Sequence, residues 1–270
     1  MLKKREIKFR TEIKIPDAPV KINPGRQVLL VGSCFSDNIG GKMLEAGLDA
    51  IVNPCGTVYN PLSISRLFDA ALSPDRAEII RSSLTVREGN IVSWLMGKKG
   101  MGATDGECVS NVDSLLSILE KGIRESQAII ITFGTSDIWF LNGTSEVVGN
   151  CHKHPAYEFG KRRMSISETV DLWSEMIDKV RNVNPDVQII FTVSPRRYLS
   201  DGFQENTRQK AVLILACDEL CRLMENVSYF PAYEIMNDDL RDYRFYKPDL
   251  LHPSDVAVEY IWQKFKESYI

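Results

Sequence analysis

Short apolar runs alternate along the chain with longer segments whose apolar residues recur at helical spacing. Runs of roughly four to eight apolar residues are typical of buried strands, whereas the helical spacing indicates a helix with one buried face. The pattern predicts strands at residues 28–31, 50–52, 85–95, 128–133, 187–193 and 227–230. It predicts helices at residues 37–46, 61–72, 112–125, 167–183, 204–225 and 255–265.

The alternation of strands and helices predicts parallel pairing, because a helical crossover returns the chain to the same end of the sheet. We therefore expect an α/β fold: a three-layer α/β/α sandwich with a mainly parallel central sheet, in which residues 28–31 form a central strand. The chain has 270 residues, 44% of them hydrophobic, which suits one large domain. No linker, low-complexity tract or internal repeat divides it, so a single domain over residues 1–270 is expected.

Charge and composition exclude several classes of protein. The net charge is −3, so no basic field attracts nucleic acid. No apolar run reaches the roughly 18–20 residues that span a membrane. Residues 1–10 are basic, but no apolar segment follows them, so no signal peptide is expected. Six cysteines are too sparse for a disulfide scaffold, which favours a reducing, cytoplasmic location, although a precursor with its signal removed would look the same.

Polar or glycine-containing segments directly follow four of the predicted strands. They are Gly32-Ser33-Cys34, Asn53-Pro54-Cys55-Gly56, Gly134-Thr135-Ser136-Asp137 and Ser194-Pro195-Arg196. Ligands of parallel sheets bind at the carboxyl ends of the strands. The four segments are therefore expected to contribute to one active site.

A carboxylate precedes a histidine by three residues near the C-terminus, at Asp249 and His252. A Pro-Ser turn and an apolar helical pattern follow at once. An Asp that orients a His makes up two thirds of a catalytic triad, and the nucleophile has to come from elsewhere in the chain. The same spacing also occurs where an Asp or Ser only caps a helix, so the pair alone leaves a structural role open.

The segment Gly-Ser-Cys-Phe-Ser at residues 32–36 resembles the signature of the GSCFA family, which belongs with the SGNH or GDSL-type hydrolases. Other segments that resemble this family lie at residues 53–61, 150–153, 191–195 and 239–246. The resemblance implies an SGNH-hydrolase-like, flavodoxin-like fold and an ester-bond hydrolase or acyltransferase. It also implies the site residues that follow.

The SGNH hydrolases carry four sequence blocks, and this chain matches them unevenly. Asp249 and His252 match the Asp-x-x-His block, and Gly56 resembles the glycine block, whose backbone N–H binds an oxyanion. Ser136 occupies the place of the Asn in the Gly-x-Asn block. A hydroxyl can still donate one hydrogen bond to an oxyanion, but this departure counts against ordinary esterase activity.

Two residues compete for the role of nucleophile. Alignment of the family's Gly-Asp-Ser-Leu-Ser block on residues 32–36 places Cys34 at the attacking position, and a shift of one residue places Ser33 there. The strand exit and the following helix favour Cys34, because a thiolate near a helix N-terminus has a lowered pKa. A Cys-His-Asp triad is chemically sound.

Three further residues are candidates for substrate binding. Asn150 and His152 are expected in a loop near the site, where they either contact the substrate or only shape the loop. Arg196 follows a strand and is expected either to bind a phosphate or carboxylate or to be solvated. No metal is expected, since the Cys and His residues lack the usual ligand spacing.

Three functions remain open. The first is hydrolysis or transfer of an acyl group from an ester or thioester through a Cys34 (or Ser33)–His252–Asp249 triad. The second is a non-catalytic SGNH-like binding domain. The third is a coenzyme-A-dependent acyltransferase that acts on a sugar or cell-envelope precursor. No cofactor is expected apart from coenzyme A as an acyl donor, and the substrate is expected to be a small molecule or a carbohydrate. The oligomeric state is left open.

Overall fold

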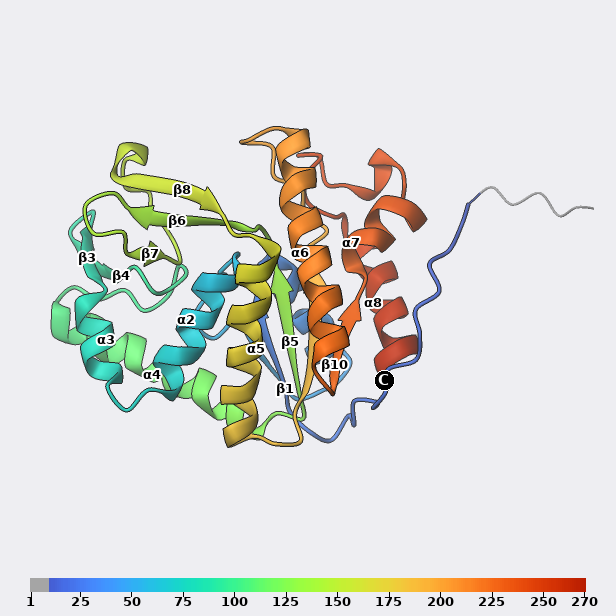
Figure 1. Ribbon diagram of the computed structural model, residues 1–270, viewed down its shortest axis with the longest axis horizontal. Coiled ribbons are helices and arrows are strands. Elements are labelled where there is room, and N and C mark those ends of the chain that lie inside the picture. The colour runs from blue at the N-terminus through green and yellow to red at the C-terminus, as the bar shows by residue number, and fades with distance from the viewer. Residues whose placement is uncertain (1–9) are drawn as a thin grey trace, which may run out of the picture.

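Five parallel strands form the centre of the computed structural model, which describes residues 10–270 (Figure 1). In chain order they are β1 (Val28–Gly32), β2 (Ala50–Val52), β5 (Ala128–Phe133), β9 (Gln188–Val193) and β10 (Val227–Phe230). Residues 1–9, which make up most of the basic stretch considered above as a signal peptide, lie outside the described residues.

The strands lie in the order β10-β9-β5-β1-β2. Counted along the chain, this is the doubly wound order 2-1-3-4-5 of flavodoxin-like sheets. Strand β1 pairs on one side with β2 and on the other with β5, where Leu30 lies opposite Ile130. The prediction that residues 28–31 form an interior parallel strand is confirmed.

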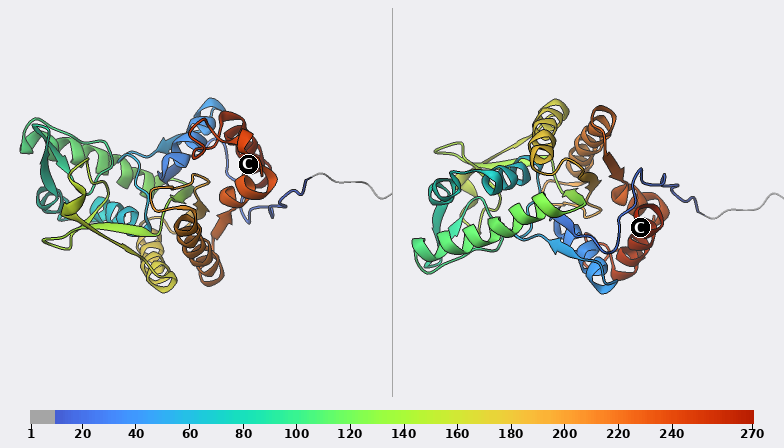
Figure 2. Two further views of the ribbon diagram at one scale, coloured as in Figure 1. Left: turned by 90° about the horizontal axis from the view of Figure 1, so that it is seen from above. Right: turned by 90° about the horizontal axis from the view of Figure 1, so that it is seen from below.

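Helices cover both faces of the sheet (Figures 1 and 2). One face packs against α1 (Cys34–Glu45) and α8 (Asp255–Tyr269). The other packs against α2 (Pro61–Leu72), α4 (Asp105–Glu125), α5 (Ile166–Val183) and α6 (Phe203–Leu223). Because successive side chains of a strand point to opposite faces, the residues of β1 divide between the two cores. The predicted three-layer α/β/α sandwich is confirmed.

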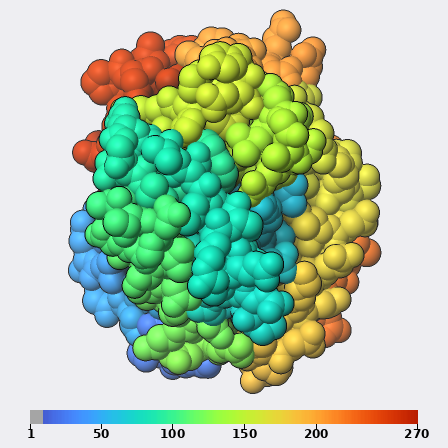
Figure 3. Space-filling view, turned by 90° about the vertical axis from the view of Figure 1, so that its left-hand side faces the viewer, coloured from blue at the N-terminus to red at the C-terminus, as the bar shows by residue number. Residues whose placement is uncertain are grey.

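Two small antiparallel sheets extend the molecule beside the carboxyl ends of the central strands (Figure 1). They are the hairpin β3 (Leu84–Arg87) and β4 (Asn90–Ser93), and the sheet of β6 (Asp137–Leu141), β7 (Val147–Val148) and β8 (Phe159–Arg163). The space-filling view shows the yellow-green residues of the second sheet above the teal and green residues of α3 (Arg76–Ser82) and α4 (Figure 3). The single β-like segment expected at residues 85–95 is this hairpin.

Helix caps explain where the predicted boundaries were displaced. Helix α1 begins at Cys34, because Ser33 accepts a hydrogen bond from the N–H of Phe35. Helix α4 begins seven residues before its predicted start, because Thr104 accepts a hydrogen bond from the N–H of Glu107. Four short helical segments complete the chain: Ala156–Glu158, α7 (Ala232–Glu234), Ile235–Asp239 and Tyr243–Phe245. Among residues 10–270, no helix is both long and apolar enough to cross a membrane.

Gly32 connects β1 to the first residues of the site. Its φ is +136°, and a Cβ at this position would lie 2.2 Å from the carbonyl oxygen of Thr132 on β5. We expect Gly32→Ala to lower the free energy of unfolding by about 3 kcal/mol or more, because neither backbone can move without breaking the sheet. Urea denaturation measures the change.

Gly41→Ala is the matched control for this variant. Gly41 lies in α1, and a Cβ there would meet no atom within 4 Å. Alanine is the better helix former, so this variant is expected to be more stable by up to about 1 kcal/mol. Equal stability of the two variants would contradict the proposed role of Gly32.

Candidate functional site

The carboxyl ends of the central strands bring several of the predicted segments together. Gly32 lies opposite Thr132 in the β1–β5 pair, and Phe133 lies opposite Val193 in the β5–β9 pair. The segments that begin at Ser33, Gly134 and Ser194 therefore follow one another along the same edge of the sheet. This is the edge at which parallel sheets bind their ligands.

Ser33 and Cys34 occupy different environments. The Ser33 side chain is fully buried, and its Oγ accepts the N–H of Phe35, so this hydroxyl serves as the cap of α1. Cys34 is a free, partly exposed cysteine in the first turn of the helix. Burial raises the pKa of the Cys34 thiol above its ordinary value, although the positive charges of Arg196 and Lys210 act to lower it, so the lowered pKa expected for Cys34 at the helix N-terminus is wrong. Of the two residues, Cys34 is therefore the more accessible one.

Asp249 holds the imidazole of His252. Its Oδ2 lies 2.5 Å from Nδ1 of His252, and its Oδ1 accepts the backbone N–H groups of Leu251 and His252. These hydrogen bonds lower the pKa of the Asp249 carboxyl below its usual range. The cap of α8 is Ser254, which accepts the N–H of Ala257. Because another residue caps the helix, Asp249 is left to fix the ring of His252.

The segment after β9 lies between the loop that carries His252 and the start of α1. The N–H of Arg197 donates to the carbonyl of Leu251 at 3.1 Å, and the charge of the neighbouring Arg196 acts on Cys34. Within residues 10–270, no hydrogen bond joins His252 to Cys34 or Ser33. Convergence of Cys34, His252 and Asp249 into a triad stays a prediction.

Gly56 differs from its predicted role as an oxyanion donor. Its N–H already donates to the carbonyl of Asn53 at 2.9 Å, inside a turn where Gly56 has a φ of +79°. A Cβ at Gly56 would lie 3.0 Å from the backbone nitrogen of Lys98, so the glycine is needed for this close approach. The role assigned to Gly56 therefore has to be corrected: this N–H is engaged in the turn and is not free for a substrate oxygen.

Asn53 stabilises the start of the site, a role that was not predicted for it. Its Oδ1 accepts the N–H of Gly32 at 2.8 Å, and its Nδ2 donates to Asp37 of α1 at 2.7 Å. Its φ is +40°, a conformation that asparagine tolerates better than most residues. An Asn placed directly after a strand and before a proline was the available signal.

Asn150 and His152, predicted together as substrate residues, face different surroundings. Asn150 lines a cavity of about 220 Å³, and its Oδ1 accepts the N–H of His152. The His152 ring is buried, with Nε2 2.9 Å from the carbonyl of Ser93 and its face near Trp94. Burial lowers the pKa of His152. These contacts favour the structural role for His152, whereas Asn150 keeps its place at a cavity.

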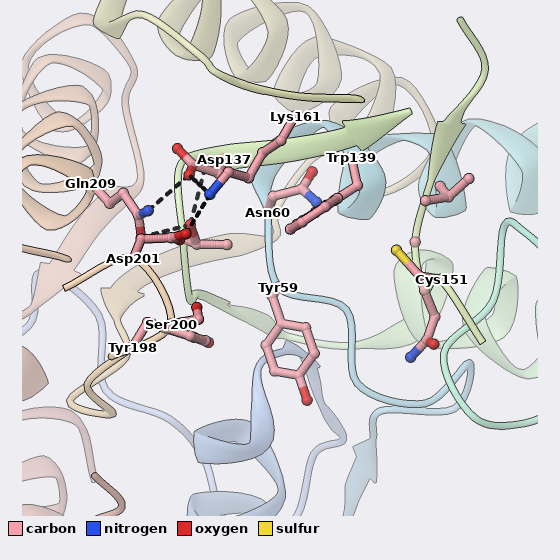
Figure 4. A pocket seen from close by; sticks show the side chains of 14 residues that line it. Tyr59, Asn60, Asp137, Trp139, Cys151, Lys161, Tyr198, Ser200, Asp201 and Gln209 are labelled. Carbon is pink, nitrogen blue, oxygen red and sulfur yellow. Dashed lines mark hydrogen bonds and ion pairs between the residues drawn. The ribbon is translucent and has the colours of Figure 1, made fainter. Parts of the chain in front are cut away.

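Three aromatic residues and a network of polar groups line the cavity (Figure 4). Lys161 pairs with Asp201 at 2.7 Å and with Asp137 at 3.5 Å, and Gln209 donates to Asp137 at 2.8 Å. The aromatic rings are those of Tyr59, Trp139 and Tyr198, and the remaining lining residues are Asn60, Thr135, Val148, Gly149, Asn150, Cys151 and Ser200. The polar network was missed because its members come from β6, β8, α6 and a loop, with no common spacing in the sequence.

Ser136 and Lys210 are buried polar residues at the same edge of the sheet. The Ser136 side chain is fully buried, and its Oγ has no hydrogen-bond partner. Nζ of Lys210 donates to the carbonyls of Gly134 and Ser194 at 2.6 and 2.8 Å. Burial, and secondarily the charge of Arg196, lowers the pKa of Lys210 to about 7. Among the described residues, no three His, Cys, Asp or Glu side chains are grouped so that they could hold a metal ion.

Comparison with models of protein families shows to which family the chain belongs. The model of the GSCFA family matches residues 27–265. The chain belongs to the GSCFA family. The match takes in every strand of the central sheet and both ends of the site, from Cys34 to His252.

No curated protein matches this GSCFA protein. Among solved structures, it is similar to a proposed platelet activating factor from Streptococcus pneumonia, with a TM-score of 0.48, 10% identity, and 92% of this chain and 86% of the other covered. A carbohydrate esterase family 2 enzyme from Corynascus thermopiles gives a TM-score of 0.44 and 13% identity, over 94% of this chain and 67% of the other. A family 3 carbohydrate esterase from Clostridium thermocellum gives 0.39 and 11%, over 90% and 94%. Because the identities are 13% or less and the TM-scores are below 0.5, the activities in these names are stated of the other proteins alone.

Proposed function

We propose that this GSCFA protein hydrolyses or transfers an acyl group from an ester or thioester, with Cys34 as nucleophile, His252 as general base and Asp249 as the residue that orients the imidazole. The observation that carries the proposal is the 2.5 Å contact between Asp249 and Nδ1 of His252. Asp249 thereby fixes the ring so that Nε2 is the nitrogen available to accept a proton. Cys34 supplies the partly exposed thiol in the first turn of α1.

The reaction follows the acyl-transfer pattern of such triads. Nε2 of His252 takes the proton of the Cys34 thiol as the sulfur attacks the carbonyl carbon. The new S–C bond forms while one electron pair of the C=O bond moves to oxygen. Collapse of this intermediate expels the alcohol or thiol, which takes the proton from the imidazolium. Water or an acceptor hydroxyl then attacks the acyl-enzyme, gives its proton to His252, and releases Cys34.

The cavity beside the site suggests the kind of alcohol that is released. It is about 220 Å³ in volume, and it presents the rings of Tyr59 and Trp139 beside amide, carboxylate and ammonium groups. Aromatic faces surrounded by hydrogen-bonding groups suit a small polyol such as a sugar unit, whose C–H faces are apolar and whose hydroxyls need partners. The acylated hydroxyl of such a substrate would face Cys34.

The coenzyme-A-dependent alternative rests on the cysteine block at residues 32–36 together with two adjacent arginines after β9, Arg196 and Arg197. Arg197 lies over the rings of Phe203, Tyr243 and Tyr246, with its guanidinium carbon 4.3 to 5.8 Å from their centroids. A guanidinium packed in this way is less available to a diphosphate than a solvated one. The proposal therefore favours an ester or simple thioester as the acyl donor.

A panel of aryl esters, aryl thioesters and acyl-coenzyme A, each tested with and without sugar acceptors, tests the proposed function. We expect turnover of at least one donor, and we expect it to be lost in step with the alkylation of Cys34 by iodoacetamide. Peptide mapping follows the alkylation of Cys34 separately from that of Cys151 and Cys221, which are also partly exposed. Turnover that survives complete alkylation of Cys34 would exclude the cysteine mechanism. If the protein binds acylated sugars but turns none of them over, it is the non-catalytic binding domain. Ser136, in place of the Asn of the Gly-x-Asn block, favours this alternative.

A further inference from the structure

Lys210 is a buried lysine at the carboxyl edge of the central sheet. It lies on α6 and is only 1% exposed, although lysine is seldom buried. Its ammonium donates to the carbonyls of Gly134 and Ser194, which follow β5 and β9. Two neutral carbonyls satisfy hydrogen bonds of this group without neutralising its charge.

Arg196 and Tyr198 add two unused donors beside Lys210. Nε of Arg196 is buried without a hydrogen-bond partner, and the buried hydroxyl of Tyr198 has no partner apart from the neighbouring Arg196 side chain. The guanidinium carbon of Arg196 lies 4.9 Å from the centroid of the Tyr198 ring, and Nζ of Lys210 lies 5.1 Å from it. Buried donors without partners are rare in proteins and point to a ligand that completes them.

These groups lie next to the proposed nucleophile. A Cβ at Gly134 would be 2.6 Å from the Tyr198 hydroxyl, so this hydroxyl lies directly against the strand end that neighbours β1. Cys34 begins the helix that follows β1. The charges of Arg196 and Lys210 both act on the Cys34 thiol, and the charge of Cys34 acts on Tyr198.

The two cations have no fixed counter-charge in the part of the chain that the structure describes. Neither Arg196 nor Lys210 forms an ion pair with a carboxylate between residues 10 and 270. The nearby buried carboxylate of Asp137 pairs instead with Lys161 and Arg163, at 3.5 and 3.6 Å. A charge on the buried Lys210 is costly without a partner, which is why burial lowers its pKa to about 7, and an anion that enters the site offsets this cost and favours the charged form.

We propose that Arg196, Tyr198 and Lys210 form an anion pocket that receives the negative charge which develops beside Cys34 during acyl transfer. The hydroxyl of Tyr198 and Nε of Arg196 donate hydrogen bonds to the oxyanion of the intermediate, and both are catalytic residues in this sense. Lys210 acts through the two carbonyls and its charge, and it is a positioning residue. This inference deepens the proposed function and rests on it.

The pocket supplies oxyanion donors that the predicted residues provide only in part, since the Ser136 hydroxyl can donate a single hydrogen bond. The N–H of Gly56 is engaged in a turn, and Ser136 replaces the Asn that would donate an amide N–H. Oxyanion stabilisation requires donors placed in advance where water is excluded. The buried, unpartnered donors of Arg196 and Tyr198 meet this requirement at the neighbouring strand end.

Alkylation of the cysteines tests the pocket without any need for turnover. Iodoacetate carries a negative charge and iodoacetamide is its neutral counterpart, so the ratio of their rates at one thiol reports the attraction of anions to it. Peptide mapping gives this ratio separately for Cys34 and for Cys151, a partly exposed thiol whose pKa is raised by burial alone. We expect the ratio to be about tenfold or more higher at Cys34, and to fall with added salt.

Single substitutions assign the effect to the pocket. Arg196→Gln and Lys210→Met are each expected to bring the ratio at Cys34 close to that at Cys151. Arg162→Gln is the matched control, because this arginine is about half exposed and lies on β8. Two results would contradict the anion pocket. One is an equal ratio of iodoacetate to iodoacetamide rates at both cysteines of the unmodified protein, and the other is a ratio at Cys34 that neither pocket substitution lowers. If a pocket variant does not fold, the effect of salt on the unmodified protein still tests the pocket: the ratio at Cys34 is expected to fall as salt is added, and a ratio that does not change with salt would contradict the pocket.

Tyr198→Phe separates an oxyanion from a fixed charge on the substrate. This variant keeps both cations, so the alkylation ratio is expected to persist. In an assay with the acyl donor that the substrate panel identifies, the kcat of Tyr198→Phe is expected to fall about 10²-fold, while its KM stays within about threefold of the unmodified protein's. A rise in KM at unchanged kcat would show that the pocket binds a charged group of the substrate, and it would contradict the oxyanion role. An alkylation preference without any turnover would sink the proposed function and leave the anion pocket intact.

Discussion

Cys34→Ala is expected to lower the turnover of an ester or thioester substrate by on the order of 10³-fold or more. The variant removes the attacking sulfur and nothing that holds the fold, since Cys34 is partly exposed and forms no disulfide. Ser33→Ala removes the cap of α1, so it is expected to lower the free energy of unfolding by about 1 kcal/mol. Its turnover is expected to fall by no more than about tenfold to a hundredfold, through displacement of the neighbouring sulfur.

Initial rates and urea denaturation, measured on the same preparations, separate the two variants. The expected pattern is a stable but inactive Cys34→Ala protein and a less stable but partly active Ser33→Ala protein. If Ser33→Ala were inactive and Cys34→Ala retained near-normal turnover, the nucleophile would be Ser33 and the alignment would shift by one residue.

His252→Ala is the second substitution with a large expected effect, again on the order of 10³-fold in turnover. Asp249→Asn is expected to cost about 10²-fold or more, because the amide can no longer stabilise the imidazolium or fix the tautomer. The Asn oxygen can still accept the N–H groups of Leu251 and His252, so the loop is expected to keep its shape. Stability should therefore change little in either variant.

Ser254→Ala is the control for these two variants. Ser254 caps α8 only two residues after His252, so its loss is expected to cost about 1 kcal/mol of stability and little turnover. If Ser254→Ala reduced turnover as much as Asp249→Asn, the Asp-x-x-His segment would have a structural role only. Full activity of Asp249→Asn would lead to the same conclusion.

The central sheet could be predicted because each of its interior strands is apolar on both faces. Strands β1, β5 and β9 are buried throughout, so their sequences read as continuous apolar runs between polar segments. Strands β6 and β8 were not predicted. In β8 the sequence Phe-Gly-Lys-Arg-Arg buries only Phe159, and Gly160 accommodates the ring of Phe140. A small, mostly solvated sheet leaves no such run in the sequence.

The pairing of Asp249 with His252 could be predicted for a similar reason, since three residues of separation suffice to bring the two side chains together. The anion pocket could not be predicted from the sequence. A lysine in a long helix is ordinarily solvated, and only the tertiary packing of α6 against two strand ends buries Lys210. Tyr198 gains its position from Gly134, which lies more than sixty residues earlier in the chain. Residues that meet only through tertiary packing have no common spacing in the sequence.

Capture of the acyl-enzyme tests the central claim most directly. The protein is mixed with an activated acetyl ester or thioester, quenched in acid within the first turnover, and digested for peptide mass mapping. The account predicts one acetyl group per chain on the sulfur of Cys34, and none in the Cys34→Ala protein. An acetyl group on Ser33 or elsewhere, or full turnover with no acyl group on Cys34 at any quench time, would contradict it.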